Sequence, residues 1–233
     1  MTYQWQEYAD AASAAQALAE SVADALQHTL TKQAHAVLAV SGGRSPIAFF
    51  EALSQIELDW AKVGITLVDE RIVPVQHADS NTNLVRQYLL QNKAAVATWL
   101  PMIDPQADEA ALADTQQAVA FALTHYRQPD VLVLGMGNDG HTASLFPQAP
   151  QFADGVSPDY PATLLHTTPM TAPHERISMT LAAIEQTAFV YLAIGGAEKQ
   201  TVFQQAAASI NPQLPISYVL NSEKVVCHVY FAH

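Results

Sequence analysis

The chain has 233 residues, of which half are hydrophobic and 14% are charged, so it has enough apolar material for one continuous core and too little charge for a disordered chain. Ten Lys and Arg residues against twenty-two Asp and Glu residues give a formal net charge of −12, which argues against a nucleic-acid surface and against binding to anionic lipid. The first ten residues contain neither a basic leader nor the apolar run of a signal peptide, and no later run reaches membrane-spanning length, so we expect a cytoplasmic protein.

The predicted elements alternate between strands and helices. In chain order they are a helix over 9–30, a strand over 35–40, a helix after position 45, a strand over 65–68, a helix over 82–90, a short strand over 99–103, a helix over 107–126, strands over 131–134, 162–167 and 176–180, a short helix after 180, a strand over 188–194, a helix over 198–208 and a strand over 225–231. This alternation predicts an α/β fold with a mainly parallel, doubly wound sheet, and we expect residues 1–233 to form a single domain.

The first glycine-rich turn, Ser41-Gly42-Gly43, follows a predicted strand and precedes a helix. Ser45 suits the N-cap of that helix, and Pro46 suits its first position. Unpaired backbone N–H groups and the helix dipole can bind phosphate at such a turn. A tight turn that is needed only for its geometry explains the same residues equally well.

A second glycine-rich turn follows the apolar run Val131–Leu134, which is typical of an interior parallel strand. This turn carries Asp139 and His141, beyond the carboxyl end of the strand, where open α/β sheets bind ligands. His141 can serve as a general base whose tautomer Asp139 fixes, although a loop histidine beside a turn-forming aspartate gives the same pattern. The turn also contains three glycines that can take positive φ or approach a ligand closely, namely Gly135, Gly137 and Gly140.

Several other kinds of site are disfavoured. The nine histidines show no HxxxH or HExxH pair, so no metal site is predicted, and Cys227 has no partner for a disulfide and is expected to be a buried thiol. The glycine spacing does not match GxGxxG, which disfavours a dinucleotide cofactor. The serine-hydrolase elbow GxSxG is absent, and Ser144 is interpreted as a cap.

Five motifs in a fixed order resemble those of the 6-phosphogluconolactonase family, the branch related to the glucosamine-6-phosphate deaminases. They are VSGGRSP at 40–46, VDERIVP at 68–74 followed by Asp79-Ser80-Asn81, LGMGNDGHTASLFP at 134–147, ERISMT at 175–180 and GAEK at 196–199. The resemblance implies a three-layer α/β sandwich with a modified Rossmann-type sheet, hydrolysis of 6-phosphogluconolactone in the oxidative pentose phosphate pathway, and no cofactor.

The resemblance also implies roles for particular residues. His141 would be the general base and Asp139 its neighbour in the site. Around the phosphate it places Ser41, Gly42, Gly43, Arg44 and Lys199. Arg71 and Arg176 would contact substrate oxygens or the phosphate, whereas Asp69, Glu70 and Asn81 receive no role, and Asp69-Glu70-Arg71 is either a second acidic pair or a structural ion cluster.

Two other functions remain alternatives to the lactonase. The deaminases carry a glutamate, used in opening the sugar ring, where this chain has Phe146, so deaminase or isomerase action on glucosamine 6-phosphate is disfavoured. The other alternative is a non-catalytic sugar-phosphate sensor. The expected partner is a small phosphorylated sugar lactone, with no nucleic acid or membrane, and the chain is expected to be a monomer or a small homo-oligomer.

Overall fold

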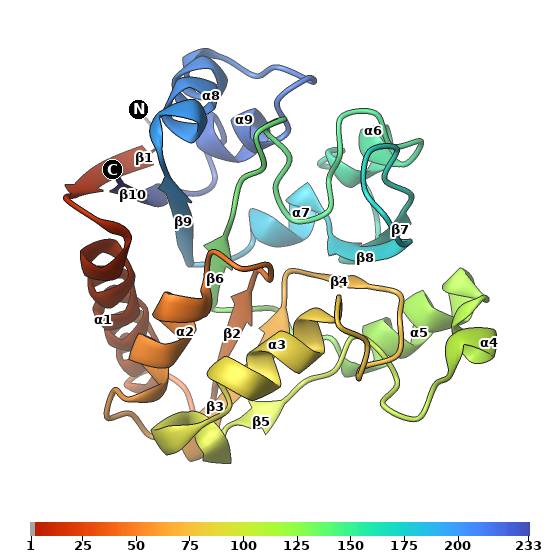
Figure 1. Ribbon diagram of the computed structural model, residues 1–233, viewed down its shortest axis with the longest axis horizontal. Coiled ribbons are helices and arrows are strands. Elements are labelled where there is room, and N and C mark those ends of the chain that lie inside the picture. Colours follow the sequence, from red (N-terminus) through yellow and green to blue (C-terminus); the bar gives the residue numbers. More distant parts are fainter. Residues whose placement is uncertain (1–2) are drawn as a thin grey trace.

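A computed structural model describes residues 3–233 and shows a central sheet of seven parallel strands with helices around it (Figure 1). The strand order is β1-β10-β9-β6-β2-β3-β5. These strands are β1 (Tyr3–Tyr8), β2 (Ala36–Val40), β3 (Val63–Leu67), β5 (Thr98–Trp99), β6 (Val131–Leu134), β9 (Phe189–Gly195) and β10 (Cys227–Ala232). The predicted α/β fold with a mainly parallel sheet is therefore confirmed.

Nine α-helices connect and cover the strands within residues 3–233. They are α1 (Ala11–Leu30), α2 (Ile47–Ser54), α3 (Asn81–Tyr88), α4 (Glu109–Leu112), α5 (Thr115–His125), α6 (Phe152–Gly155), α7 (Leu181–Ile184), α8 (Ala197–Ala208) and α9 (Ile216–Leu220). Two short 3₁₀ helices, η1 (Trp60–Lys62) and η2 (Asn92–Val96), flank β3 and β5. No helix among the described residues is long and apolar enough to span a lipid bilayer.

Consecutive residues of β10 show that helices cover both faces of the sheet. The Tyr230 hydroxyl donates to Ser21 Oγ of α1 at 2.6 Å, which places α1 on one face. The next residue, Phe231, points to the opposite face. Its ring stacks on Trp5, and Trp5 in turn contacts Phe203 of α8. The fold is thus the three-layer sandwich that was expected.

The site is positioned by the neighbouring strands β2 and β6. After β2 the chain crosses to its neighbour β3, whereas after β6 it crosses in the other direction to β9. The turns after the two strands therefore diverge, and they leave a crevice at their carboxyl ends, which is where doubly wound sheets bind ligands. The turns at 41–43 and 135–141, both singled out from the sequence, lie at this crevice.

A second, antiparallel sheet of three strands lies beside the main one, in the order β4-β8-β7. Its strands are β4 (Asp69–Arg71), β7 (Leu164–Thr167) and β8 (Arg176–Met179). The predicted strands over 162–167 and 176–180 therefore exist but do not join the parallel sheet. The chain passes directly from β3 through Val68 into β4, and the Val68 carbonyl accepts the Met179 N–H at 2.9 Å, which attaches the small sheet to the large one.

Three further predictions of local structure were wrong. The helix over 107–126 is interrupted, because Asp114 accepts the N–H groups of Gln116 and Gln117 and so caps a new helix, α5. The strand over 99–103 is reduced to the two-residue β5. Ser45 does not cap α2, since that helix begins at Ile47 after Pro46 and has no side-chain cap.

Strand β1 was not predicted, because its six residues are polar or aromatic, with no aliphatic side chain among them, and two of them are exposed. The expectation that Cys227 is a buried thiol is confirmed, and a serine cap is found at α3. Ser80 accepts the Asn83 N–H and caps α3. Cys227 is fully buried, and burial raises the pKa of its thiol to about 12.

Candidate active site

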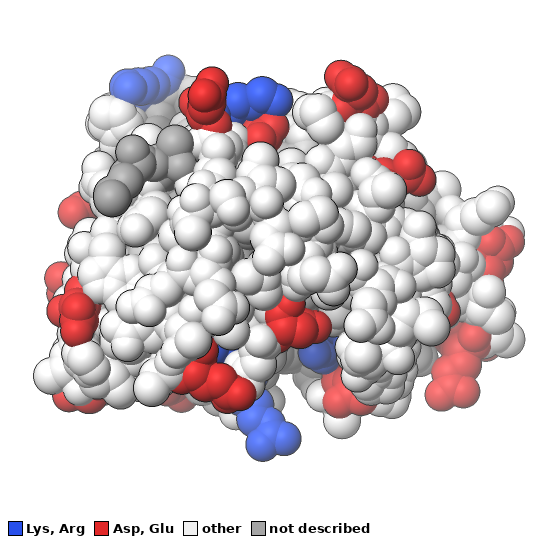
Figure 2. Space-filling model, turned by 90° about the horizontal axis from the view of Figure 1, so that it is seen from above, with Lys and Arg blue, Asp and Glu red and all other residues white. Residues whose placement is uncertain are grey.

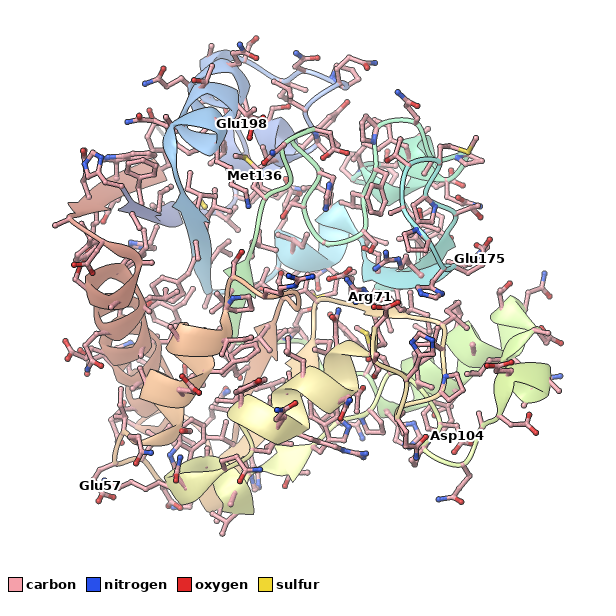
Figure 3. The ribbon with its side chains drawn as sticks, in the orientation of Figure 1. Glu57, Arg71, Asp104, Met136, Glu175 and Glu198 are labelled. Atoms are coloured by element: carbon pink, nitrogen blue, oxygen red, sulfur yellow. The ribbon has the colours of Figure 1, made fainter. Side chains whose placement is uncertain are left out.

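A cleft of about 640 Å³ opens at the carboxyl ends of β2 and β6. Seven of the nine predicted site residues line it, namely Ser41, Gly42, Gly43, Arg71, His141, Arg176 and Lys199. Asp139 lies behind His141, and Arg44 is exposed and is not among the lining residues. Figure 3 shows Arg71 at the centre of the molecule, between the turn that follows β2 and strand β8.

His141 and Asp139 form a hydrogen-bonded pair. The distance between His141 Nδ1 and Asp139 Oδ1 is 2.5 Å, and the backbone N–H of His141 donates to the same oxygen at 3.2 Å. The hydrogen bond from His141 holds the pKa of the Asp139 carboxyl below its usual value. An ionised carboxylate accepts a hydrogen bond from Nδ1–H, so it fixes the tautomer that leaves Nε2 unprotonated.

The ring of His141 is confined from two directions. Phe146, which is buried, lies 4.4 Å from it between ring centroids at an interplanar angle of 32°. On the backbone side, a Cβ built on Gly137 would come within 2.2 Å of His141 Nδ1. Of the three glycines in this turn only Gly140 has a positive φ, of 73°, so Gly137 is required for close approach and not for its backbone conformation.

The turn at 41–43 is held by its neighbours. Ser41 Oγ accepts the Gly135 N–H at 3.2 Å, which joins the two glycine-rich turns. Gly43 has a φ of 90°, a conformation that favours glycine. Gly42 lies directly against the amide of Asn81, because a Cβ there would fall 1.9 Å from Asn81 Oδ1.

Two arginines face each other across the small sheet. Arg71 of β4 and Arg176 of β8 are direct register partners, an arrangement that places two like charges side by side. Arg176 is only 6% exposed, and burial lowers the pKa of its guanidinium, against the opposing effect of nearby Asp69. Within residues 3–233, the Nε atom of each arginine is buried without a hydrogen-bond partner. One buried and one half-buried guanidinium, each incompletely satisfied and both lining a cleft, are suited to bind an anion.

Lys199 contributes a third cation, from the first turn of α8. Burial lowers the pKa of its ammonium group, and the neighbouring Glu198 opposes that effect. Glu198 also accepts a hydrogen bond from Asn138 at 2.7 Å, which ties the second glycine-rich turn to α8. Figure 3 labels Glu198 and Met136 on either side of this junction.

The structure separates the two carboxylates of the Asp69-Glu70-Arg71 motif. Glu70 is fully buried and is structural. It accepts hydrogen bonds from the N–H groups of Arg71, Asn81 and Thr82 and from the hydroxyls of Thr82 and Ser80, so it holds the start of α3 against β4. Asp69 instead lines the cleft. The sequence pattern does not distinguish these two carboxylates, because all the hydrogen-bond partners of Glu70 except Arg71 lie about ten residues further along the chain.

Ser144 is a cleft residue that was interpreted as a cap, and that interpretation was wrong. It is fully buried, its hydroxyl donates to Asp69 Oδ2 at 2.6 Å, and its N–H donates to Ser178 Oγ at 3.0 Å. The same serine connects the turn after β6 with both β4 and β8. Its position just after His141 in the sequence was the only available signal.

Comparison with known proteins gives a consistent result. Residues 9–227 match the family model described as glucosamine-6-phosphate isomerases/6-phosphogluconolactonase. A 6-phosphogluconolactonase of Neisseria meningitidis is 61% identical over 228 residues, which cover 98% of each chain. The crystal structure of a Neisseria gonorrhoeae protein superposes with a TM-score of 0.97 at 61% identity, covering 99% of this chain and 100% of the other. That of a 6-phosphogluconolactonase from Shewanella baltica has a TM-score of 0.88 at 34% identity, covering 99% and 98%.

Proposed function

The chain belongs to the family of glucosamine-6-phosphate isomerases and 6-phosphogluconolactonases, and from this premise we propose how the residues of the cleft carry out its reaction. The reaction is the hydrolysis of 6-phosphogluconolactone to 6-phosphogluconate, a step of the pentose phosphate pathway, and the chain is an enzyme. The roles of the individual residues below are the proposal.

His141 is the general base. With Nδ1–H donated to the Asp139 carboxylate, its unprotonated Nε2 takes a proton from a water molecule as that water attacks C1 of the lactone. The tetrahedral oxyanion then collapses, the bond from C1 to the ring oxygen breaks, and the leaving oxygen takes the proton from His141. General-base catalysis of this kind contributes about 10²- to 10⁴-fold in rate, a sufficient amount for an activated ester that needs no covalent nucleophile.

The phosphate is bound by the cations of the cleft. Arg71, Arg176 and Lys199 converge there, although the whole chain has only ten basic residues and a net charge of −12. Figure 2 shows the contrast, with acidic groups scattered over the surface and basic atoms visible in a hollow at its lower edge. Backbone N–H groups of the turn at 41–43 add further donors. Arg44, which is exposed, would reach the phosphate only from the rim of the cleft.

The observation that carries this proposal is that the hydrogen-bonded His141 and Asp139 pair shares one cleft with three cations. A base alone or a cation cluster alone would be ambiguous, whereas together they match a substrate with a hydrolysable carbonyl and a phosphate. Phe146 argues against deamination, because an apolar ring packed against His141 cannot relay the proton that opens a sugar ring.

The test is the hydrolysis of freshly prepared 6-phosphogluconolactone, followed by acid release, for the wild type and for His141→Ala. We expect kcat to fall about 10²- to 10⁴-fold with a similar KM. His35→Ala is the matched control, because His35 is exposed and precedes β2, at the other end of the sheet. Nearly normal kcat in His141→Ala would remove His141 from the mechanism. If the wild type also hydrolyses the lactone only at the background rate and releases ammonia from glucosamine 6-phosphate, the deaminase is favoured instead.

A further inference from the structure

A second cluster of ligating side chains lies outside the catalytic cleft. His77 and Asp79 come from the loop between β4 and α3, and His174 comes from the loop before β8. One ligand atom from each lies within 4.8 Å of the other two. His174 Nε2 is 2.9 Å from Asp79 Oδ2, and His77 Nδ1 is 4.0 Å from the same oxygen. We propose that His77, Asp79 and His174 form a binding site for a divalent transition-metal ion such as Zn²⁺ or Co²⁺.

The chemistry of the donors fits such an ion. Two imidazoles and one carboxylate form a ligand set typical of zinc, with a further position left for water. Asp79 supplies the carboxylate oxygen that faces both imidazoles. His77 Nδ1 accepts the Asp79 N–H at 3.0 Å, a hydrogen bond that an ion bound through this nitrogen would replace.

The geometry needs only a small adjustment. With bonds of about 2.0–2.2 Å, two ligands of a tetrahedral zinc ion lie roughly 3.3 Å apart. Because the ligand atoms all lie within 4.8 Å of one another, the widest separation has to close by at most about 1.5 Å, which is within the reach of side-chain rotation. His174 also has a φ of 69°, an uncommon backbone conformation for a residue other than glycine, and its imidazole contacts the Asp79 carboxylate.

The cluster is accessible but separate from the cleft. A smaller cavity of about 270 Å³ is lined by both histidines and by Glu109. Adjacent residues of the chain divide the two spaces, since Arg71 lines the cleft while Ile72 lines this cavity. An ion bound here would not touch the lactone. It would instead link two loops whose backbone carbonyls, at Asp79 and Pro173, accept hydrogen bonds from Arg71 and Arg176.

The proposal differs from the expectation of no metal site that the sequence gives. That expectation depends on ligands at short, regular spacing, and here the third ligand lies 95 positions from Asp79. Only the antiparallel pairing of β4 with β8 brings the two loops together.

The test uses the untagged, chelator-treated protein, with Zn²⁺ followed by equilibrium dialysis and Co²⁺ by its visible absorption. We expect one ion per chain, a melting temperature that rises with metal concentration, and loss of both effects in His77→Ala and in His174→Ala. The matched control is His166→Ala, because His166 pairs with Glu175 and is as exposed as His174, at 27% against 25%, but has no third ligand.

The outcomes are distinguishable. Retention of binding in His166→Ala, together with its loss in the two other variants, supports the site. Wild-type binding in His77→Ala and His174→Ala overturns it, and so does the absence of any binding by the wild type at millimolar metal. Loss of binding in His141→Ala alone would also overturn it, by assigning the ion to the catalytic pair.

Discussion

Gly137 offers a sharp test of whether the His141 ring must stay where it is, through the substitution Gly137→Ala. The new Cβ would lie 2.2 Å from His141 Nδ1 and 2.6 Å from Asp139 Oδ1, whereas ordinary contacts begin at about 3.4 Å. The ring must therefore move by roughly 1 Å or more. It cannot retreat freely, because Phe146 is packed against it. A displacement of about 1 Å in a catalytic group can cost 10²-fold in rate, which corresponds to about 2.7 kcal/mol.

We therefore expect Gly137→Ala to lower kcat/KM for lactone hydrolysis about 10²-fold, with little change in the free energy of unfolding measured in urea. Gly135→Ala is the control in the same turn, since in the described part of the chain no atom beyond its two sequence neighbours lies within 4 Å of a Cβ at Gly135, and its φ is not positive. It should retain kcat, and because Gly135 lines the cleft, the added methyl group should change at most KM. Equal and wild-type kcat/KM in both variants would refute the argument that a fixed ring position is needed.

Four further results are expected from three variants. Arg176→Ala should raise KM for the lactone about 10-fold or more with a smaller change in kcat, because a charge-assisted hydrogen bond contributes about 1.5–3 kcal/mol. An unchanged KM in steady-state assays would show that Arg176 does not bind the phosphate. Asp139→Asn should lower kcat about 10²- to 10⁴-fold, since an amide can donate to Nδ1 and so favours the tautomer with Nε2 protonated. In the same variant the free energy of unfolding should depend less on pH in the acid range. The reason is that the pKa of Asp139 is lowered in the folded state, so the ionised carboxylate stabilises the wild type at pH values above the pKa of the unfolded carboxyl. The wild type loses this stabilisation as the pH falls through the pKa of the folded state. Identical pH profiles in urea titrations of the two proteins would contradict this. Glu70→Gln should cost about 1–3 kcal/mol of stability, seen as a lower urea midpoint, because one amide nitrogen would face N–H donors; an unchanged midpoint would show that the carboxylate is not needed there.

Buried, locally encoded elements were predictable from the sequence. All four residues of Val131–Leu134 are buried, so an apolar run was a sufficient signal. Strand β1 is different, because it is an edge strand in which Gln4 and Glu7 are exposed and whose pairing partner, β10, is distant in sequence. The break before α5 arises because Asp114 caps a new helix. The alanine-rich spacing of this segment is equally compatible with one continuous helix, so the pattern did not reveal the break.

In the candidate site, too, local contacts could be predicted from the sequence and long-range contacts could not. His141 and Asp139 are two residues apart and follow a recognisable strand, so their pairing could be anticipated. The role of Glu70 could not, because it depends on N–H groups from the start of α3, eleven and twelve positions later. The cluster around His174 was out of reach for a similar reason, since it forms only when two strands pair.

The position of β10 also bears on the order in which the sheet is assembled. This last strand lies between β9 and β1, and Gln6 hydrogen-bonds Tyr230 across 224 positions of sequence. While the chain is being synthesised, β1 therefore has no neighbour until residues 227–232 have emerged. Its N–H and C=O groups stay open to other chains during that interval. Completion of the central sheet thus depends on one pairing between strands that are far apart in the sequence, and removal of those six residues would leave two strands, β1 and β9, each without a partner on that side.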